Sequence, residues 1–341
     1  MTGEAAGRVG GTEPLIALEH LRLSLRGRGA SLFSRRAAQI LDDVSVTIGH
    51  REILGIVGES GSGKTTLGKA MLRLYRPKGR ILYRGKDLAG LSERQLRPFR
   101  AELQMIFQDP LSSFNPRYRI GDSIALPLLL HRHASRHEVR GAVTSLLKQV
   151  GLNAGHAERF PHELSGGQLQ RVAIARVLGL APKLIVADEA VSKLDVSVRA
   201  QILNLIKRVN RESGIAFVFI THDLTVARFL CDRIAVMYAG RIIEIGETSR
   251  IFAKPQHPYT VSLINARREP WLAAEADDAM LGATVAAHAC SFAPRCPRRE
   301  PHCLEERPSL EEREGHRVAC FHPSVEFADA DTPRLEAAGQ A

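Results

Sequence analysis

The 341-residue sequence contains no long apolar segment. No stretch approaches the ~18 consecutive apolar residues that a membrane-spanning helix needs. The most apolar patch, residues 123–130, is short and interrupted by Pro127. The N-terminal residues 1–11 are polar and rich in Gly and Ala, without the apolar core of a secretory signal. We therefore expect a soluble, cytoplasmic chain that relies on other chains for spanning segments if it works at a membrane.

Cysteine is scarce, and its few copies are unevenly placed. Four of the five lie within 31 residues near the C-terminus, at Cys290, Cys296, Cys303 and Cys320. In a cytosolic protein such a group indicates metal or cluster ligation rather than disulfide bonds. The spacing, C-x5-C-x6-C-x16-C, lacks the closely spaced pairs with which most zinc and iron–sulfur sites begin. The sequence therefore leaves three alternatives for these cysteines: an iron–sulfur cluster, a zinc ion or unliganded thiols.

Acidic residues are outnumbered, and the formal net charge is +10. Residues 265–341 carry nine Lys/Arg and fourteen Asp/Glu, whereas the remaining 264 residues carry 38 and 23. A basic surface suits nucleic acid, anionic lipid or nucleotide, but an Arg-rich solvated surface is the simpler interpretation. The acidic balance of the cysteine-bearing tail also disfavours a nucleic-acid-binding zinc module. We expect no nucleic-acid partner.

Apolar residues recur with the periods of both strands and helices. Residues 15–48 alternate as half-buried strands do, and residues 52–57 form an apolar run typical of a buried parallel strand. We predict further strands at 184–187, 216–220 and 234–237 and a helix at 65–75. Residues 91–162 are rich in helical patterns, which Pro116, Pro127 and Pro161 are expected to break. This alternation predicts an α/β fold with a largely parallel sheet. The pattern weakens after residue 245, so we place a domain boundary near residue 250.

A glycine-rich loop follows the strand at 52–57 and opens the next helix. Its residues fit G-x-x-x-x-G-K-[ST] and run Gly58, Glu59, Ser60, Gly61, Ser62, Gly63, Lys64 and Thr65, followed by Thr66. Glycines let the backbone aim successive N–H groups at phosphate oxygens, and the helix start adds its positive dipole end. Lys64 can reach the β- and γ-phosphates, and the Thr65 hydroxyl can bind Mg²⁺. The loop therefore predicts a nucleotide-binding site.

Two adjacent carboxylates, Asp188 and Glu189, follow the apolar run 184–187. At the C-terminal edge of a parallel strand, one carboxylate can hold Mg²⁺ while the next polarises an attacking water. Such a pair is common by itself, and it becomes informative together with the loop at Lys64. We predict Asp188 as a Mg²⁺ ligand and Glu189 as the catalytic base.

Four further motifs occur with these two. They are Gln108 in Ile-Phe-Gln-Asp-Pro, the run Leu164-Ser165-Gly166-Gly167-Gln168, the run Ser192-Lys193-Leu194-Asp195, and His222 in Thr-His-Asp. Together the six resemble the ATPase subunits of ABC transporters, whose signature reads Leu-Ser-Gly-Gly-Gln, over residues 15–265. The resemblance implies a P-loop NTPase (RecA-like) core with an antiparallel β subdomain, a helical signature subdomain at about 91–180, and a small C-terminal extension. The implied limits are 1–14 for a flexible N-terminus, 15–250 for the ATPase domain and 251–341 for the extension.

The resemblance also implies roles and partners. Gln108 would act at the catalytic centre and join Thr65 and Asp188 around Mg²⁺, and His222 would contact the γ-phosphate. Ser165 and the residues Gly166, Gly167 and Gln168 would bind the ATP held by Lys64 of a facing ATPase subunit, because a helix start binds anions. We expect a heterodimer that drives two membrane permease subunits at the cytoplasmic face of the inner membrane, supplied by an extracytoplasmic substrate-binding protein.

Two segments, Lys254–Thr260 and Phe107–Pro116, are similar to the dipeptide, oligopeptide and nickel importer ATPases. In some members, tails with this cysteine spacing hold a [4Fe–4S] cluster, which would assign Cys290, Cys296, Cys303 and Cys320 as its ligands. A peptide importer is the leading interpretation, and a nickel or metal-chelate importer is the alternative. An ABC ATPase acting on DNA or ribosomes is disfavoured, because the chain has one copy of each motif and no long coiled coil.

Several residues depart from the family pattern or fall outside it. Ala190 and Val191 stand where many members have Pro-Thr, and Lys193 stands where Ala is usual, so the two sites of a dimer need not be equally active. Phe33 is the only aromatic residue before Tyr75 and is the candidate for adenine stacking, with core packing as the alternative. The histidines His131, His133 and His137 lack a completing ligand, and we interpret them as solvated.

Overall fold

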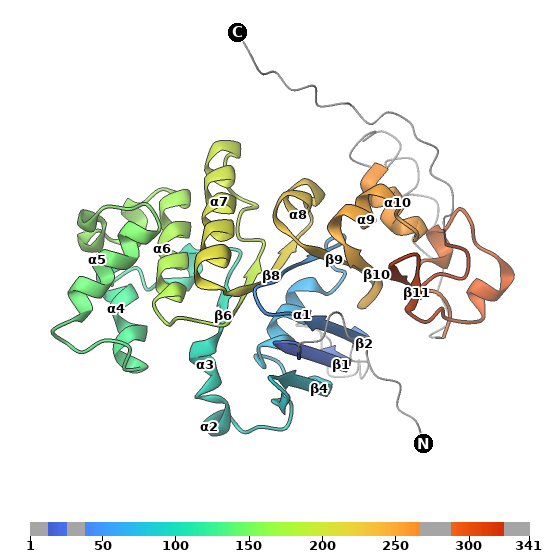
Figure 1. Ribbon diagram of the computed structural model, residues 1–341, viewed down its shortest axis with the longest axis horizontal. Coiled ribbons are helices and arrows are strands. Elements are labelled where there is room, and N and C mark those ends of the chain that lie inside the picture. The colour runs from blue at the N-terminus through green and yellow to red at the C-terminus, as the bar shows by residue number, and fades with distance from the viewer. Residues whose placement is uncertain (1–12, 26–37, 266–287, 324–341) are drawn as a thin grey trace, which may run out of the picture. The chain divides into compact units, whose positions relative to one another are not determined.

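The structure is a computed structural model that describes residues 13–25, 38–265 and 288–323 (Figure 1). The chain divides into two compact units, residues 1–242 and 243–341. The domain limits inferred from the sequence, 15–250 and 251–341, stay a prediction. Most of the N-terminal segment predicted to be flexible, and the candidate adenine-stacking residue Phe33, lie outside the described residues.

A parallel sheet forms the centre of the first unit. Its strands pair in the order β9–β3–β8–β7–β6. They are β3 (Ile53–Val57), β6 (Leu103–Ile106), β7 (Leu184–Asp188), β8 (Ala216–Thr221) and β9 (Arg233–Tyr238). Every residue of β3, β7 and β8 is buried, as expected for a sheet covered on both faces. The predicted α/β fold with a largely parallel sheet is confirmed.

A second, antiparallel sheet carries the alternating residues 15–48. Its strands, in spatial order, are β2 (Ala38–Ile48), β1 (Ile16–Leu25), β4 (Lys78–Tyr83) and β5 (Lys86–Asp87). Ile16 pairs with Ile48 on one side and with Tyr83 on the other. Apolar side chains on one face are buried while their neighbours contact solvent, which explains the period of two in the sequence.

Helices connect the strands of the first unit. They are α1 (Lys64–Met71), α2 (Glu93–Leu96), α3 (Phe99–Glu102), α4 (Ile120–Leu130), α5 (Val139–Gln149), α6 (Gly166–Leu178), α7 (Val196–Ser213) and α8 (Leu224–Leu230), with short 3₁₀ turns η1 (Leu111–Ser113), η2 (Ala154–Glu158) and η3 (Pro161–Glu163). The helices α4, α5 and α6, drawn green, gather in one region (Figure 1). Among the described residues, every helix is too short or too polar to span a bilayer.

Two helix boundaries differ from the prediction. Helix α1 ends at Met71, before the predicted residue 75, and Arg73 adopts a left-handed φ of 58°. The prediction that Pro127 breaks a helix is wrong, because Pro127 lies inside α4 and its carbonyl accepts the N–H of His131 at 3.0 Å. Proline removes one helical hydrogen bond, but burial of Ile124 and Leu128 holds the helix in place.

The second unit combines short strands and helices. Its elements are β10 (Arg241–Glu247), which begins at the end of the first unit, α9 (Thr248–Ala253), α10 (Pro258–Asn265), η4 (Ala293–Arg295), η5 (Pro301–Leu304), β11 (Glu311–Arg313) and β12 (His316–Val318). Strand β12 pairs antiparallel with both β10 and β11. The four-cysteine segment enters this sheet through β12, which ends two residues before Cys320.

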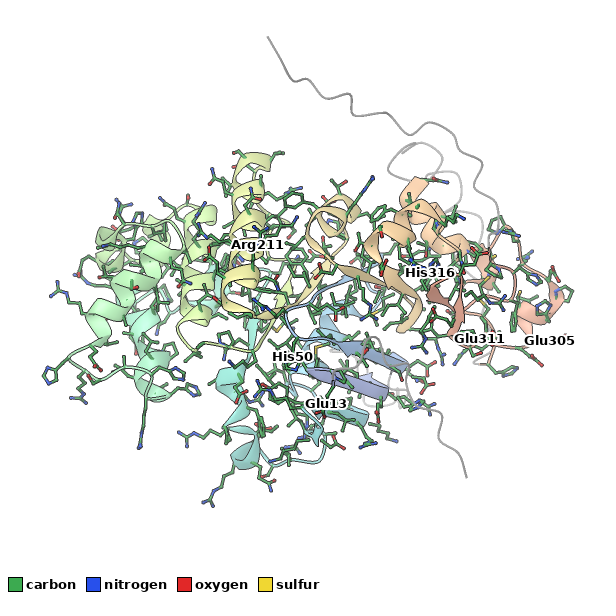
Figure 2. All side chains as sticks on the ribbon, in the orientation of Figure 1. Glu13, His50, Arg211, Glu305, Glu311 and His316 are labelled. Atoms are coloured by element: carbon green, nitrogen blue, oxygen red, sulfur yellow. The ribbon has the colours of Figure 1, made fainter. Side chains whose placement is uncertain are left out.

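A buried carboxylate, Glu244, organises this unit. Its two oxygens accept the N–H groups of Gln256 and His257 at 2.7 and 2.9 Å, and Nε2 of His316 (labelled in Figure 2) lies 2.9 Å from Oε1. Burial lowers the pKa of His257 to about 4, so its ring is neutral at pH 7. Its Nδ1 can then accept the N–H of Tyr259 at 3.0 Å. The segment 254–260 is thus fixed by hydrogen bonds to groups inside the unit.

Helix α1 packs against the parallel sheet through Gly68. A Cβ at this position would lie 2.8 Å from both Ile220 Cδ1 and Val186 Cγ1. We expect Gly68→Ala to lower the free energy of unfolding by about 1–3 kcal/mol, the cost of overpacking a core. Gly141→Ala in α5 is the matched control, because nothing lies within 4 Å of its Cβ position and Ala favours a helix. Denaturant unfolding measures both, and a Gly68 variant as stable as wild type would refute this packing.

Candidate functional site

The phosphate loop, residues 58–65, runs from the end of β3 to the start of α1. Gly58 and Gly63 have φ values of 150° and 102°, which residues with a side chain rarely adopt. A Cβ on Gly58 would lie 2.2 Å from the Met237 carbonyl oxygen, and one on Gly63 would lie 2.9 Å from that of Ile40. Glycine is therefore required at both ends of the turn. The backbone conformation suits the presentation of N–H groups to an anion.

The ammonium group of Lys64 lies inside the phosphate loop. Its Nζ donates to the carbonyl oxygens of Gly58 and Glu59 at 2.8 and 2.6 Å. Burial lowers the pKa of Lys64, and the carboxylates of Glu189 and Asp188 oppose this shift. Because neutral carbonyls are its close partners, an entering phosphate can replace them with shorter, charge-assisted hydrogen bonds.

Thr65 and Asp188 meet beside this loop. The Thr65 hydroxyl donates to Asp188 Oδ1 at 2.9 Å. Burial raises the pKa of Asp188, and the hydrogen bond from Thr65 lowers it. Hydroxyl and carboxylate oxygens are the hard donors that Mg²⁺ prefers. The two residues therefore fit a Mg²⁺ ion at the position the sequence predicts.

Glu189 is held between two side chains. The Gln108 amide donates to its Oε2 at 2.7 Å, and His222 Nδ1 lies 3.0 Å from its Oε1. The side chain of Glu189 is 20% exposed and that of His222 is 59% exposed, so water can reach both. A carboxylate fixed in this way can orient a water molecule and take its proton.

The strand ends explain why these side chains converge. Strand β3 leads into the phosphate loop, and β6 ends two residues before Gln108. Strand β7 ends at Asp188, and β8 ends at Thr221, directly before His222. The carboxyl ends of parallel strands share one edge of the sheet, which is the usual ligand-binding edge. The sheet therefore brings Gln108 and His222, two residues predicted from the sequence, to Glu189.

The residues from Ser165 to Gln168 lie elsewhere in the first unit. Ser165 Oγ accepts the N–H of Gln168 at 3.3 Å, and Gln168 Oε1 accepts the N–H of Ser165 at 3.1 Å. This capping box opens α6. A Cβ on Gly167 would lie 2.3 Å from Val198 Cγ1 in α7, which explains the glycine. Figure 1 shows α6 well apart from α1, so a single chain does not bring Ser165 to Lys64.

The run 192–195 connects the site to α7. The Ser192 hydroxyl donates to the Glu189 carbonyl at 3.0 Å, and Lys193 is exposed. Sequence reasoning missed the ion pair between Arg199 and Asp223, whose N and O atoms are 3.4 Å apart. Asp223 was recognisable as a helix N-cap, because it precedes the apolar pattern of α8 and accepts two backbone N–H groups there.

The four clustered cysteines line one cavity of the second unit. None of these four cysteines forms a disulfide among the described residues. Burial raises the pKa of Cys290, Cys296 and Cys320, and charge on neighbouring thiols raises it further. The cavity volume is about 20 Å³, which is room for about one water-sized group. The [4Fe–4S] cluster stays a prediction from the sequence.

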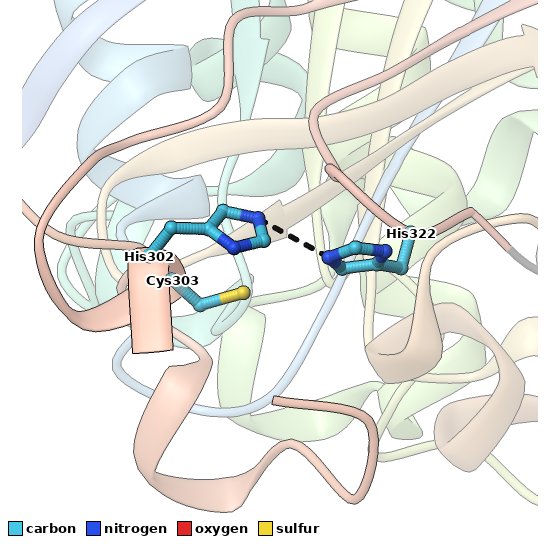
Figure 3. Close-up of side chains that lie close together, drawn as sticks. All are labelled: His302, Cys303 and His322. Atoms are coloured by element: carbon cyan, nitrogen blue, oxygen red, sulfur yellow. Dashed lines mark hydrogen bonds between the residues drawn. The ribbon is translucent and has the colours of Figure 1, made fainter. Parts of the chain in front are cut away.

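Two histidines near these thiols were missed by sequence reasoning. His302 and His322 place ring nitrogens within 4.8 Å of each other and of Cys303 Sγ (Figure 3). His302 directly precedes Cys303, and His322 follows Cys320 by two residues. This proximity to predicted ligands was the signal that could have identified them.

Known proteins resemble the chain along most of its length. The family described as "ABC transporter" matches residues 41–192, and "Oligopeptide/dipeptide transporter, C-terminal region" matches residues 243–303. YkfD of Bacillus subtilis is 44% identical over 317 residues, covering 90% of this chain and 95% of that protein. The oligopeptide transport ATP-binding protein OppF of Salmonella typhimurium is 42% identical over 295 residues, covering 84% and 88%.

A solved structure gives the same result for the fold. The ATP-binding cassette MJ0796, in a dimeric post-hydrolysis state bound to ADP and Pi, matches with a TM-score of 0.62 and 29% identity. The match covers 68% of this chain and 98% of that chain. The resemblance inferred from the six motifs is confirmed.

We expect Lys64→Ala to weaken ATP binding about 10- to 100-fold, because one charge-assisted hydrogen bond contributes about 1.5–3 kcal/mol. Lys78→Ala, an exposed position of β4, is the control for loss of a positive charge and should bind ATP as wild type does. Calorimetric titration of ATP into each variant measures the affinity. Unchanged affinity of the Lys64 variant would exclude its contact with phosphate.

We expect Glu189→Gln to leave ATP binding intact and to slow hydrolysis about 10²- to 10⁴-fold, the contribution of a general base. The amide keeps the shape of the carboxylate but cannot take a proton from water. Glu212→Gln, on an exposed position of α7, is the matched control and should not change the rate. Phosphate release under single-turnover conditions separates the two variants. Turnover of Glu189→Gln at the wild-type rate would assign the base to another group.

Proposed function

Because the chain belongs to the ABC transporter ATPases and carries the C-terminal region of oligopeptide/dipeptide transporters, we propose that it hydrolyses ATP to energise an importer of dipeptides or oligopeptides. One observation carries the enzymatic part: the Glu189 carboxylate is held between Gln108 and His222 beside the phosphate loop. The peptide specificity rests on the C-terminal region and on the relatives that carry it.

The side chains at the sheet edge divide the chemistry among them. Lys64 would bind the β- and γ-phosphates, and Thr65, Asp188 and Gln108 are the residues that would hold Mg²⁺. When bound there, the ion would supply positive charge to offset the charge that develops on the transferring phosphoryl group. Glu189 takes a proton from the attacking water, and His222, directly after the neighbouring strand β8, contacts the γ-phosphate. These roles agree with the hydrogen bond from Thr65 to Asp188 and with the water-accessible carboxylate of Glu189.

A second ATPase subunit completes each site. The capped start of α6 at Ser165 is a good anion-binding position, but it lies apart from α1 in the same chain (Figure 1). A facing subunit can bring its own Ser165 to the ATP held by Lys64. The dimeric state of the MJ0796 cassette supports this arrangement. We infer that the partner is a sister ATPase rather than a second copy, as the resemblance to the peptide importer ATPases implies.

The groove between α4, α5 and η2 is a candidate contact for the membrane permeases. It has a volume of about 560 Å³ and is lined by Arg119, Ala125, Val139 and Val143 among others. A groove lined by both apolar and charged side chains can accept an amphipathic helix. We propose that a short permease helix binds here, which would hold the ATPase at the cytoplasmic face of the inner membrane. A substrate-binding protein on the other side of the membrane would deliver the peptide.

We expect the isolated chain to hydrolyse ATP slowly and the assembled transporter to hydrolyse it quickly, because each site needs a signature segment from another subunit. The test reconstitutes the chain, a sister ATPase and two permeases in liposomes with the binding protein. It measures ATP turnover and uptake of a labelled oligopeptide. A fully active monomer would exclude the dimeric site, and uptake of nickel without peptide would exclude the peptide substrate.

The variant Ala125→Arg tests the permease contact separately. It fills the groove, so it should reduce copurification with the permeases while ATP binding stays unchanged. Ser145→Arg, an exposed position of α5 outside the groove, is the matched control. Equal copurification of both variants would place the permease contact elsewhere.

A further inference from the structure

Arg199, near the start of α7, contacts two segments of the nucleotide site. One terminal nitrogen, Nη1, lies 3.4 Å from Asp223 Oδ2. The other, Nη2, donates to the Leu194 carbonyl at 3.2 Å. Leu194 belongs to the run 192–195, and Asp223 directly follows His222. One guanidinium group therefore connects this run to the segment that carries His222.

The Asp223 carboxylate fixes the backbone at the start of α8. Its Oδ1 accepts the N–H groups of Thr225 and Val226 at 2.9 and 3.1 Å and so caps the helix. The Asp223 N–H donates to Thr221 Oγ1 at 2.9 Å. Its Oδ2 is the oxygen that pairs with Arg199. The start of α8 and Arg199 therefore hold the two oxygens of one carboxylate.

The position of the His222 ring depends on this backbone. His222 follows Thr221, the last residue of β8, and precedes the cap at Asp223. Its Nδ1 lies 3.0 Å from Glu189 Oε1. Its side chain is 59% exposed, so packing alone does not fix the ring. A change at Asp223 should therefore move the ring relative to Glu189.

The pair of Arg199 and Asp223 is partly buried. The two side chains are 29% and 16% exposed, so salt screens their attraction less than that of a surface pair. Arg199 Nε is buried and has no hydrogen-bond partner in the part of the chain that the structure describes. A buried donor without a partner lowers stability, which offsets part of what the other two contacts of this side chain contribute. We therefore expect Arg199 to matter more for the geometry of the site than for the stability of the fold.

The start of α7 is a rigid base for this side chain. The Arg199 N–H donates to the Asp195 carbonyl at 2.8 Å. The preceding residue, Val198, packs against α6, because a Cβ on Gly167 would lie 2.3 Å from Val198 Cγ1. An arginine on a fixed backbone can hold two partners at once with its planar fork, whereas a lysine ammonium presents a point charge. The guanidinium group therefore holds its two partners at a set separation.

We propose that Arg199 is a positioning residue for ATP hydrolysis. By holding Asp223, it sets the His222 ring beside Glu189 and toward the γ-phosphate. This role rests on the proposed function, in which His222 contacts the γ-phosphate. Arg199 acts through His222 and is not itself a catalytic residue. Loss of its guanidinium group should slow hydrolysis and leave nucleotide binding intact.

The test follows a single turnover of ATP by the full chain, with the chain and Mg²⁺ in excess. We expect Arg199→Gln to slow phosphate release about 10- to 100-fold, because a displacement of about 1 Å in a catalytic group can cost ~10²-fold. Asp223→Asn should slow it to a similar extent, since asparagine still caps a helix but carries no charge for Arg199. Arg199→Lys keeps the charge and should lose less than Arg199→Gln.

A double substitution separates positioning from a merely structural role. His222→Ala by itself should slow turnover about 10²- to 10³-fold, the effect of losing a group that stabilises the transition state. In the His222→Ala chain, the further change Arg199→Gln should alter the rate less than ~2-fold, because the effects of residues that act as one unit are not additive.

Arg211→Gln is the matched control, because Arg211 (labelled in Figure 2) is an exposed arginine of the same helix. This variant should turn over at the wild-type rate. ADP affinity is the folding control and should be equal in all variants, since ADP lacks the γ-phosphate. A further loss of similar size from Arg199→Gln in the His222→Ala chain would overturn the proposal, as would wild-type turnover of Arg199→Gln itself. Wild-type turnover of His222→Ala would instead contradict the proposed role of His222, and the role of Arg199 with it.

Discussion

The parallel pairing of β8 with β3 on one side and β7 on the other is the constraint on which the nucleotide site depends. Val57, at the start of the phosphate loop, pairs with Thr221, and Asp188 pairs with Ile220. This register brings the loop, the two carboxylates and His222 to one edge. A slip by one residue would turn each side chain to the opposite face of the sheet. The buried side chains of these three strands prevent such a slip, because they would lose their packing.

The same strand register places the charges of Lys64 and Asp188 close enough to stabilise each other. Burial alone would favour the neutral forms of both Lys64 and Asp188, and the structure shows pKa shifts in these directions. The two groups lie close enough for their opposite charges to reduce the shifts. The site therefore keeps a cation and an anion ready for a phosphate and a metal ion, respectively. Glu189 is the more accessible carboxylate, and its partners Gln108 and His222 leave it open to water.

The two segments to which the proposed function assigns ATP binding are separated within the chain. The phosphate loop belongs to the parallel sheet, and the capped start of α6 at Ser165 belongs to the helical region. Gly167 packs closely against Val198, which fixes the start of α6 against α7. A local rearrangement therefore cannot bring the start of α6 to the start of α1. Under the proposed function, this separation means that ATP hydrolysis requires a second subunit. The second unit is held by different interactions, with Glu244 and the histidine–cysteine group inside it.

The sequence by itself determined the features that depend on local pattern. The phosphate loop, the strand ending at Asp188 and the capped helix at Ser165 each follow from residue types at short, fixed spacings. Only the tertiary structure decided which distant side chains meet. The bond between Gln108 and Glu189 spans 81 residues, and the contact between His302 and His322 spans 20. The prediction for Pro127 was wrong because burial of α4 outweighs the local tendency of proline to break a helix. Strand order and packing arise from contacts between residues that are far apart in sequence. The local periodicity of the sequence does not predict these contacts.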